Sequence, residues 1–374
     1  MKIKEVATAT SQFPIEQTHE FRNLLDKIAA IKDTHLADAI PAELFKPNIW
    51  RGLLGVFVSY MLYIGSIVAL AYAPHWSLYV PLWLIGGLGG FGLYCIGHDC
   101  GHNSFSRSHL FNYVIGQMVL LPLLFPFHGW RHMNNFHHSN TNRLDLDPDW
   151  RPISRDQFKR MSLWDRLMYA GARSWFWWFS TVNYQWHCVL PSSFTRHEAR
   201  NDVRHSIVVV LVFAISYLSM LVYFTSWQGL LLYFVGPWIA IHAWFSTTTL
   251  MHHTTEELPF LTKAHWTPNA GRLLLTTDYN YPKWLHFLTH NLSLHTAHHV
   301  APTVPFYNLL KAREAIKRAH PGMVREKKIA FRELFKIICR CHFYDPLHGY
   351  YVAFGKPESS FPGAASRARL EPNP

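Results

Sequence analysis

The residues best suited to chemistry in this chain are histidines that stand at helical spacings. His98 and His102 are four apart in "GHDCGH", and His295, His298 and His299 stand at i, i+3 and i+4 in "HTAHH". Residues three and four apart share one face of a helix, and imidazole nitrogens on one face can bind one metal ion. Each group taken alone is equally compatible with ordinary polar residues at the end of a helix.

Two further groups strengthen the metal hypothesis. Asn134, His137 and His138 repeat the i, i+3, i+4 spacing in "NNFHH", and His252 and His253 are adjacent in "TLMHHTTEE". Eight or so imidazoles without cysteine ligands favour iron or zinc over magnesium or calcium, which prefer oxygen. That number exceeds one four-coordinate site, so the sequence predicts two metals, with the choice between iron and zinc left open by the imidazole count.

Long apolar segments must position these histidines. Hydrophobic residues make up 49% of the 374 residues and charged residues 16%. The segments 52–97 and 206–251 contain no Lys, Arg, Asp or Glu, and each is long enough for two spans of about 20 residues. Turn-forming residues interrupt them at "APHWS" and "TSWQG". We therefore expect an all-α integral membrane protein whose four transmembrane helices, at about 52–73, 78–97, 206–225 and 229–251, form two hairpins below a cytosolic helical cap that carries the histidines.

The charge distribution sets the expected orientation. Neither predicted hairpin turn contains Lys or Arg, so all 35 basic residues lie on one side of the membrane. The positive-inside rule makes that side cytoplasmic, with both termini and the metal site. The net charge of +11 is explained by contacts with anionic lipid headgroups rather than nucleic acid, because no nucleic-acid-binding module is recognisable. Residues 1–45 are expected to form a cytosolic arm, 46–354 the membrane domain and 355–374 a disordered tail.

The motifs "GHDCGHNSF", "PFHGWR", "HTAHH", "VPFYNL" and "CHFYDPLHGY" resemble those of the membrane fatty acid desaturases, and more narrowly of the bacterial and cyanobacterial acyl-lipid desaturases of the Δ12 (omega-6) type. The resemblance extends from about residue 40 to residue 354. It implies a centre of two Fe ions that uses O2 to introduce a cis double bond into a membrane-associated acyl chain. It also implies an integral protein of the bacterial inner membrane.

Carried over residue by residue, the resemblance implies the metal ligands His98, His102, His137, His138, His253, His295, His298 and His299. It places His252, His290, Asn291 and His342 beside the ligands or on the substrate side. The substrate would be an acyl lipid or another acyl carrier. Because the chain shows no haem, ferredoxin or nucleotide motif, an external donor such as a ferredoxin or a cytochrome must supply electrons.

The chain departs from the family pattern at one position. The middle motif normally reads HxxHH, and here Asn134 stands in place of its first histidine. Three interpretations are open. In the first, Asn134 binds a metal through its amide oxygen, directly or through water. In the second, His132 is the ligand through an irregular backbone, and in the third the site is metal-poor and inactive. We prefer the first interpretation, because Asn is a capable although weak oxygen donor.

The altered position keeps other functions open. A related diiron enzyme could hydroxylate its substrate or form a triple bond or a terminal alkene, and a zinc-binding membrane protein or transporter would need no redox chemistry.

Asp145, Asp147 and Asp149 in "RLDLDPDW" lack the pattern of a calcium loop and are expected to be solvated or paired with Arg. His242 either faces the acyl tunnel or makes an ordinary hydrogen bond between helices. Residues 111–127 are expected to form a re-entrant or interfacial helix.

Overall fold

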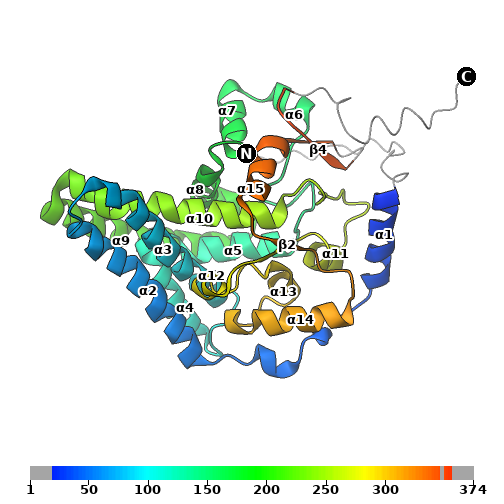
Figure 1. Ribbon diagram of the computed structural model, residues 1–374, viewed down its shortest axis with the longest axis horizontal. Helices are drawn as coiled ribbons and strands as arrows, with labels where there is room; N and C mark the ends of the chain where they lie inside the picture. The colour runs from blue at the N-terminus through cyan, green and yellow to red at the C-terminus, as the bar shows by residue number, and fades with distance from the viewer. Residues whose placement is uncertain (1–18, 346–348, 356–374) are drawn as a thin grey trace, which may run out of the picture.

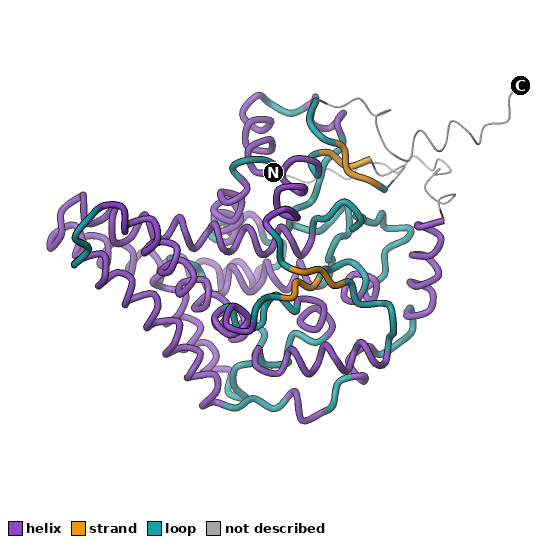
Figure 2. The backbone as a smooth tube through the Cα atoms, viewed as in Figure 1, coloured by secondary structure: helices purple, strands orange, loops and turns teal. Residues whose placement is uncertain are grey.

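The computed structural model describes residues 19–345 and 349–355, and its architecture is dominated by helices (Figures 1 and 2). The predicted tail from residue 355 onward lies outside this range except for its first residue. The N-terminal half contains α1 (His19–Ile31), α2 (Ile49–Ala71), α3 (Tyr79–Gly101), α4 (His109–Leu120), α5 (Phe127–His138), α6 (Arg155–Arg160), α7 (Leu163–Ala172) and α8 (Ser180–Cys188). The C-terminal half contains α9 (His197–Leu230), α10 (Gly236–His253), α11 (Pro268–Leu273), α12 (Lys283–Leu288), α13 (His295–Val300), α14 (Leu309–Ala319) and α15 (Phe331–Arg340).

Two small sheets complete the described part. β1 (Asp278–Asn280) pairs in parallel with β2 (Glu326–Lys328), and β3 (Phe343–Asp345) pairs antiparallel with β4 (Tyr350–Val352). Figure 1 shows the long helices α2, α3, α9 and α10 gathered at one end of the molecule, and the shorter elements α11, α13 and α14 with α1 at the other. The molecule therefore has an apolar helical end and a mixed end built of short elements.

Three helical stretches of the described residues are long and apolar enough to cross a membrane. They are Ile49–Ala71, Trp76–Gly101 and His197–His253. The segments His109–Leu123 and Phe127–His138 pass the same test together but are bent by 100°. This break falls in the segment expected to be a re-entrant or interfacial helix, and it raises the number of candidate spans to four if the bent pair is one span.

The stretch from α9 to α10 folds back on itself. Ser226 has φ 64° and ψ −175°, which is not helical, and it lies in the predicted turn 225–229. The rings of Tyr217 and Phe234 lie 5.9 Å apart. A straight helix would separate two such residues by about 25 Å, so the backbone break at Ser226 turns this stretch into a hairpin.

Small residues allow the apolar helices to approach closely. A Cβ added at Gly89 of α3 would lie 2.6 Å from the backbone nitrogen of Tyr63 in α2. One added at Gly87 would lie 2.5 Å from the Cβ of Ala240 in α10. Close backbone approach is the usual basis of helix packing in membranes, where lipid is as apolar as the side chains. These glycines fix the position of α3 between α2 and α10, and α3 in turn fixes His98.

Candidate metal centre

Helix ends place all eight predicted ligands. His98 lies in the last turn of α3, with His102 as its C-cap, and His137 and His138 end α5. His253 is the last residue of α10, and α13 carries the other three histidines. A helix end can be buried and still present side chains to a shared space, so four separate helices supply one site.

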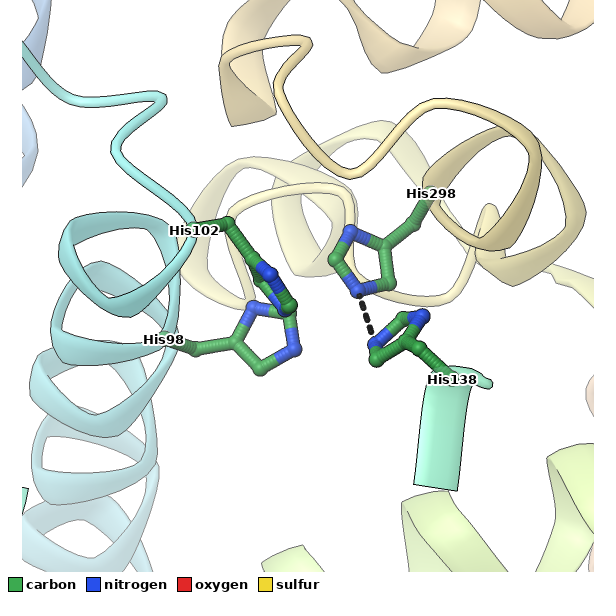
Figure 3. Close-up of side chains that lie close together, drawn as sticks. All are labelled: His98, His102, His138 and His298. Atoms are coloured by element: carbon green, nitrogen blue, oxygen red, sulfur yellow. Dashed lines mark hydrogen bonds between the residues drawn. The ribbon is translucent and has the colours of Figure 1, made fainter. Parts of the chain in front are cut away.

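The first group consists of His98, His102, His138 and His298. Their nearest ring nitrogens all lie within 4.8 Å of one another. The Nε2 atoms of His138 and His298 are 3.0 Å apart, and Figure 3 shows the four rings turned toward a common space. The side chains come from α3, α5 and α13, which are distant in sequence.

The second group consists of His137, His253, His295 and His299, also within 4.8 Å of one another. His295 Nε2 lies 2.9 Å from His253 Nε2 and 3.0 Å from His299 Nε2. The neighbouring His137 and His138 divide between the two groups, which therefore adjoin. The structure thus brings the eight predicted residues together as two adjacent sets of four.

The donor set fits metal ions. A neutral imidazole nitrogen carries either one proton or one lone pair, so His295 Nε2 cannot complete good hydrogen bonds to two other ring nitrogens. Two ligands at right angles on one metal, each about 2.1 Å from it, stand about 3.0 Å apart. The observed separations of 2.9 to 3.0 Å match that value. A cation at each group would accept the lone pairs of ring nitrogens that cannot all form hydrogen bonds with one another.

Burial keeps the histidines of α13 in the form that binds metal. His295, His298 and His299 are at most 6% exposed. Burial lowers the pKa of all three well below the usual value, and the neighbouring histidines lower each pKa further. Neutral imidazole with a free lone pair is the ligand form, so these side chains are prepared for a metal near neutral pH.

A buried carboxylate orients His137. Asp147 is fully buried, and its Oδ1 accepts a hydrogen bond from His137 Nδ1 at 2.8 Å. Its Oδ2 accepts another from the backbone N–H of Asn142 at 2.6 Å. A carboxylate on Nδ1 fixes the tautomer and the ring orientation, and it leaves Nε2 free for a metal. His137 Nε2 is buried and has no hydrogen-bond partner among the described residues.

The sequence interpretation of this acidic loop was right for one residue and wrong for another. Asp145 is half exposed and paired with Arg143, as expected. Asp147 is neither solvated nor paired with Arg but supports a candidate ligand. Asp145 and Asp147 stand at equivalent positions in the alternation of Leu and Asp, so no local pattern predicts that only Asp147 is buried.

Asn134 and His132 point to different surroundings. Asn134 is 7% exposed, and its Nδ2 lies 2.8 Å from Nε2 of His102. His132 instead places its Nε2 2.8 Å from Oδ2 of Asp202 in α9, with 30% of its side chain exposed. The structure therefore brings Asn134 to the first group of histidines and leaves His132 outside both groups.

The remaining predicted residues lie around the centre or away from it. His252 donates from Nδ1 to the carbonyl of Thr277 at 2.6 Å, and its ring stacks on that of His295 at 4.3 Å. His290 Nε2 lies 2.8 Å from Ser59 Oγ in α2. Asn291 Nδ2 donates to the carbonyl of Phe306 at 3.1 Å. Of this set, only His252 touches a candidate ligand through its ring.

His242 and His342 make structural hydrogen bonds. His242 Nδ1 lies 2.8 Å from Thr181 Oγ1, which joins α10 to α8 as the second of the two interpretations expected. His342 uses both ring nitrogens, one with the carbonyl of Ile338 and one with the N–H of Phe354, each at 2.9 Å. Neither residue lines the cavity described next.

A cavity of about 490 Å³ leads from the histidines toward α7 and α8. His98, Asn134, His137, His138, His253 and His295 line its inner end. Aromatic side chains such as Tyr94, Tyr184 and Phe245 line its walls. The volume is within the range of about 300 to 1,000 Å³ typical of small-molecule sites. The candidate metal centre is thus accessible to an apolar substrate.

The fold and the site define a helical, membrane-associated protein with a histidine-rich candidate metal centre. Residues 74–328 match the family model described as fatty acid desaturase. The chain is 32% identical over 327 residues to an sn-1 oleoyl-lipid 12-desaturase of a Picosynechococcus strain, which covers 87% of this chain and 94% of that one. It is 34% identical over 316 residues to the sn-1 acyl-lipid omega-3 desaturase (ferredoxin) of a Nostoc strain, an alignment that covers 82% of this chain and 87% of that protein. It is 29% identical over 361 residues to the chloroplastic omega-6 fatty acid desaturase of Arabidopsis thaliana, an alignment that covers 95% of this chain and 79% of that protein.

This chain belongs to the fatty acid desaturase family. The predicted resemblance is confirmed, and the protein is an oxidoreductase that acts on fatty acyl chains.

Proposed function

We propose that this protein is an O2-dependent desaturase that introduces a cis double bond into a membrane-associated acyl chain, with two iron ions held by the eight histidines. The observation that supports this most is the convergence of two four-histidine groups at the inner end of one cavity. Redox-active metals beside an apolar cavity fit a reaction of dioxygen with an unactivated hydrocarbon. The unit that carries this activity would be residues 46–354.

The reaction removes one hydrogen from each of two neighbouring methylene groups. One acyl CH2–CH2 unit, O2, two electrons and two protons give one CH=CH unit and two water molecules. O2 is the oxidant, and iron held by the histidines would activate it for both hydrogen removals. The protein holds the chain beside the histidines, and the aromatic walls of the cavity exclude water. Asp147 keeps His137 in one tautomer throughout.

Asn134 would complete the first metal site through its amide. Rotating the amide by half a turn brings Oδ1 to the position that Nδ2 now occupies, 2.8 Å from His102 Nε2. An amide oxygen is a weaker donor than imidazole, so this metal would be the more electrophilic of the two. The same weaker donor favours, as a second candidate, a related oxidative outcome such as hydroxylation. Analysis of the products of the wild type and of Asn134→His for hydroxy, acetylenic and terminal-alkene species distinguishes the two.

The electron donor would be a separate protein of the ferredoxin or cytochrome type. A relative from a Nostoc strain carries ferredoxin in its name. The oleoyl-lipid and acyl-lipid names of the relatives support a lipid-bound acyl chain as substrate. By the positive-inside argument, the centre and both termini would lie on the cytoplasmic side of a bacterial inner membrane, with four spans in two hairpins.

The experiment is expression of the chain in a host that lacks this activity, followed by gas chromatography and mass spectrometry of the host lipids. New unsaturated acyl chains are expected with the wild type and with His132→Gln, since His132 lies outside both groups. They are expected to vanish with His137→Ala and with His298→Ala. Purified wild type and His132→Gln should hold about two irons per chain, the number given by two four-histidine groups. Zinc in place of iron, or unchanged lipids from a protein loaded with iron, would refute the proposal.

A further inference from the structure

The outer part of the cavity differs chemically from the part beside the histidines. It is lined by Met161 after α6, by Trp164 and Met168 of α7, and by Asn183, Tyr184 and His187 of α8. Two arginines, Arg151 and Arg173, also line it. A purely hydrocarbon substrate has no use for a cation, so the arginines indicate where a polar part of the substrate lies.

Arg173 is buried without a complete set of partners. It is 4% exposed, and its Nη2 donates to the backbone carbonyl of Trp150. Its guanidinium lies 5.9 Å from the centre of the Tyr169 ring. Nη1 is buried and has no hydrogen-bond partner, and no ion pair of Arg173 is found in the part of the chain that the structure describes. A buried guanidinium with one unsatisfied N–H donor is costly, so an acceptor oxygen of a ligand would stabilise it.

The backbone that holds Arg173 is itself strained. Trp150 has φ 46°, a conformation that a bulky residue rarely adopts. Its indole Nε1 donates to Thr249 Oγ1 of α10 at 2.9 Å, which anchors the side chain to a long helix. Strained residues persist where the surroundings enforce them, and they concentrate at ligand sites. The strain at Trp150 therefore coincides with the unpartnered guanidinium.

The charges around the cavity decide which ligand group fits. Arg151 and Arg173 are balanced by Asp149 and Asp165, which line the same cavity. A phosphate would meet two carboxylates, whereas a carbonyl oxygen needs only one strong donor. An acyl chain has such an oxygen at its head, in a glycerolipid ester, in a thioester or in a free acid.

We propose that Arg173 binds the carbonyl oxygen at the head of the acyl substrate, while the chain runs inward along Tyr184, Tyr94 and Phe245 to the histidines. This inference rests on the proposed desaturase function. Trp164 lines the cavity, and it is 59% to 73% exposed together with Leu163 and Leu167 of α7 and Trp186 of α8. Such a surface fits hydrocarbon, and it favours the glycerolipid ester among the three sources of the carbonyl.

The test is equilibrium binding of acyl ligands to the purified, iron-free full chain in detergent. An oleoyl glycerolipid ester is compared with the corresponding ether lipid, which lacks only the carbonyl oxygen. The wild type should bind the ester about tenfold or more tightly than the ether, the value of one hydrogen bond from a charged donor. Arg173→Gln should bind both lipids equally, and Arg173→Lys should regain part of the preference. Arg340→Gln, which removes an exposed arginine paired with Glu256, should bind as the wild type does.

Equal binding of ester and ether by the wild type overturns the inference, and it needs no variant that folds. An unchanged ester preference in a folded Arg173→Gln overturns it as well. Oleoyl thioester and free oleic acid are measured beside the ester, and tightest binding of either one would overturn the assignment to a glycerolipid. Because binding is measured without iron, a protein that passes this test but makes no double bond refutes the proposed function and leaves the carbonyl subsite standing.

Discussion

Removal of the Asp147 carboxylate should weaken metal binding far more than removal of its neighbour Asp145. Asp147 accepts hydrogen bonds from His137 Nδ1 at 2.8 Å, Asn142 N at 2.6 Å and Asp149 N at 2.9 Å. In Asp147→Asn, an NH2 group replaces one of the accepting oxygens, so one buried donor faces another donor. Each unsatisfied buried donor costs about 1 to 3 kcal/mol. Loss of the carboxylate behind a metal-binding histidine typically lowers metal affinity by about 10 to 100-fold.

The assay is retention of iron during titration with a chelator, accompanied by the absorption spectrum of the cobalt-substituted protein. Asp147→Asn should release one metal at a chelator concentration about 10 to 100-fold lower than the wild type does. Asp145→Asn is the matched control, because its side chain is 49% exposed and pairs with Arg143 at the surface. Such a pair contributes about 0 to 1 kcal/mol. The reasoning is refuted if Asp147→Asn retains iron as the wild type does, or if both variants lose it equally.

Two further predictions concern packing and pH. Gly89→Ala should destabilise the protein in detergent by about 1 to 3 kcal/mol, because the added Cβ would lie 2.6 Å from the backbone nitrogen of Tyr63. Gly65→Ala is the control, since its Cβ meets no atom within 4 Å, and it should be neutral or stabilising. Thermal unfolding measures both variants. Burial raises the pKa of Asp278 to about 6, although the hydrogen bond from the N–H of Thr296 by itself lowers that pKa. Because the folded pKa lies above the unfolded value, the folded state favours protonated Asp278. The stability from this protonation is fully present below about pH 4 and is lost as the pH rises through 6. Asp278→Asn should flatten the dependence of iron-free thermal stability between these values, and an unchanged slope would contradict this assignment.

Local patterns in the sequence located the histidine clusters, and the family resemblance then selected the eight candidate ligands among them. The spacing of i, i+3 and i+4 in "HTAHH" and the four-residue spacing of His98 and His102 both follow from helix geometry, and the structure has helices at both places. The turn at 225–229 was likewise predicted from the turn-forming residues "TSWQG", and Ser226 breaks the helix there. These features depend on residues close together in sequence, so pattern analysis can detect them.

Features that depend on distant contacts were not predictable in the same way. Nothing near Arg173 in sequence indicates that its partner is the carbonyl of Trp150 or that one of its nitrogens is left without an acceptor. The division of His137 and His138 between two groups depends on where α10 and α13 end in space. The pairing of His132 with Asp202 of α9 and the position of Asn134 beside His102 likewise depend on residues that are distant in sequence.

The order in which the ligands occur along the chain has a consequence for biogenesis. Each group of four contains at least one histidine from α13, which begins at His295, while the earliest ligand is His98. A nascent chain that has inserted all its apolar helices still lacks part of each candidate group of four histidines. On the proposed function, iron capture would wait until translation has passed residue 299, and a shortage of iron would leave an inserted but inactive protein in the bilayer.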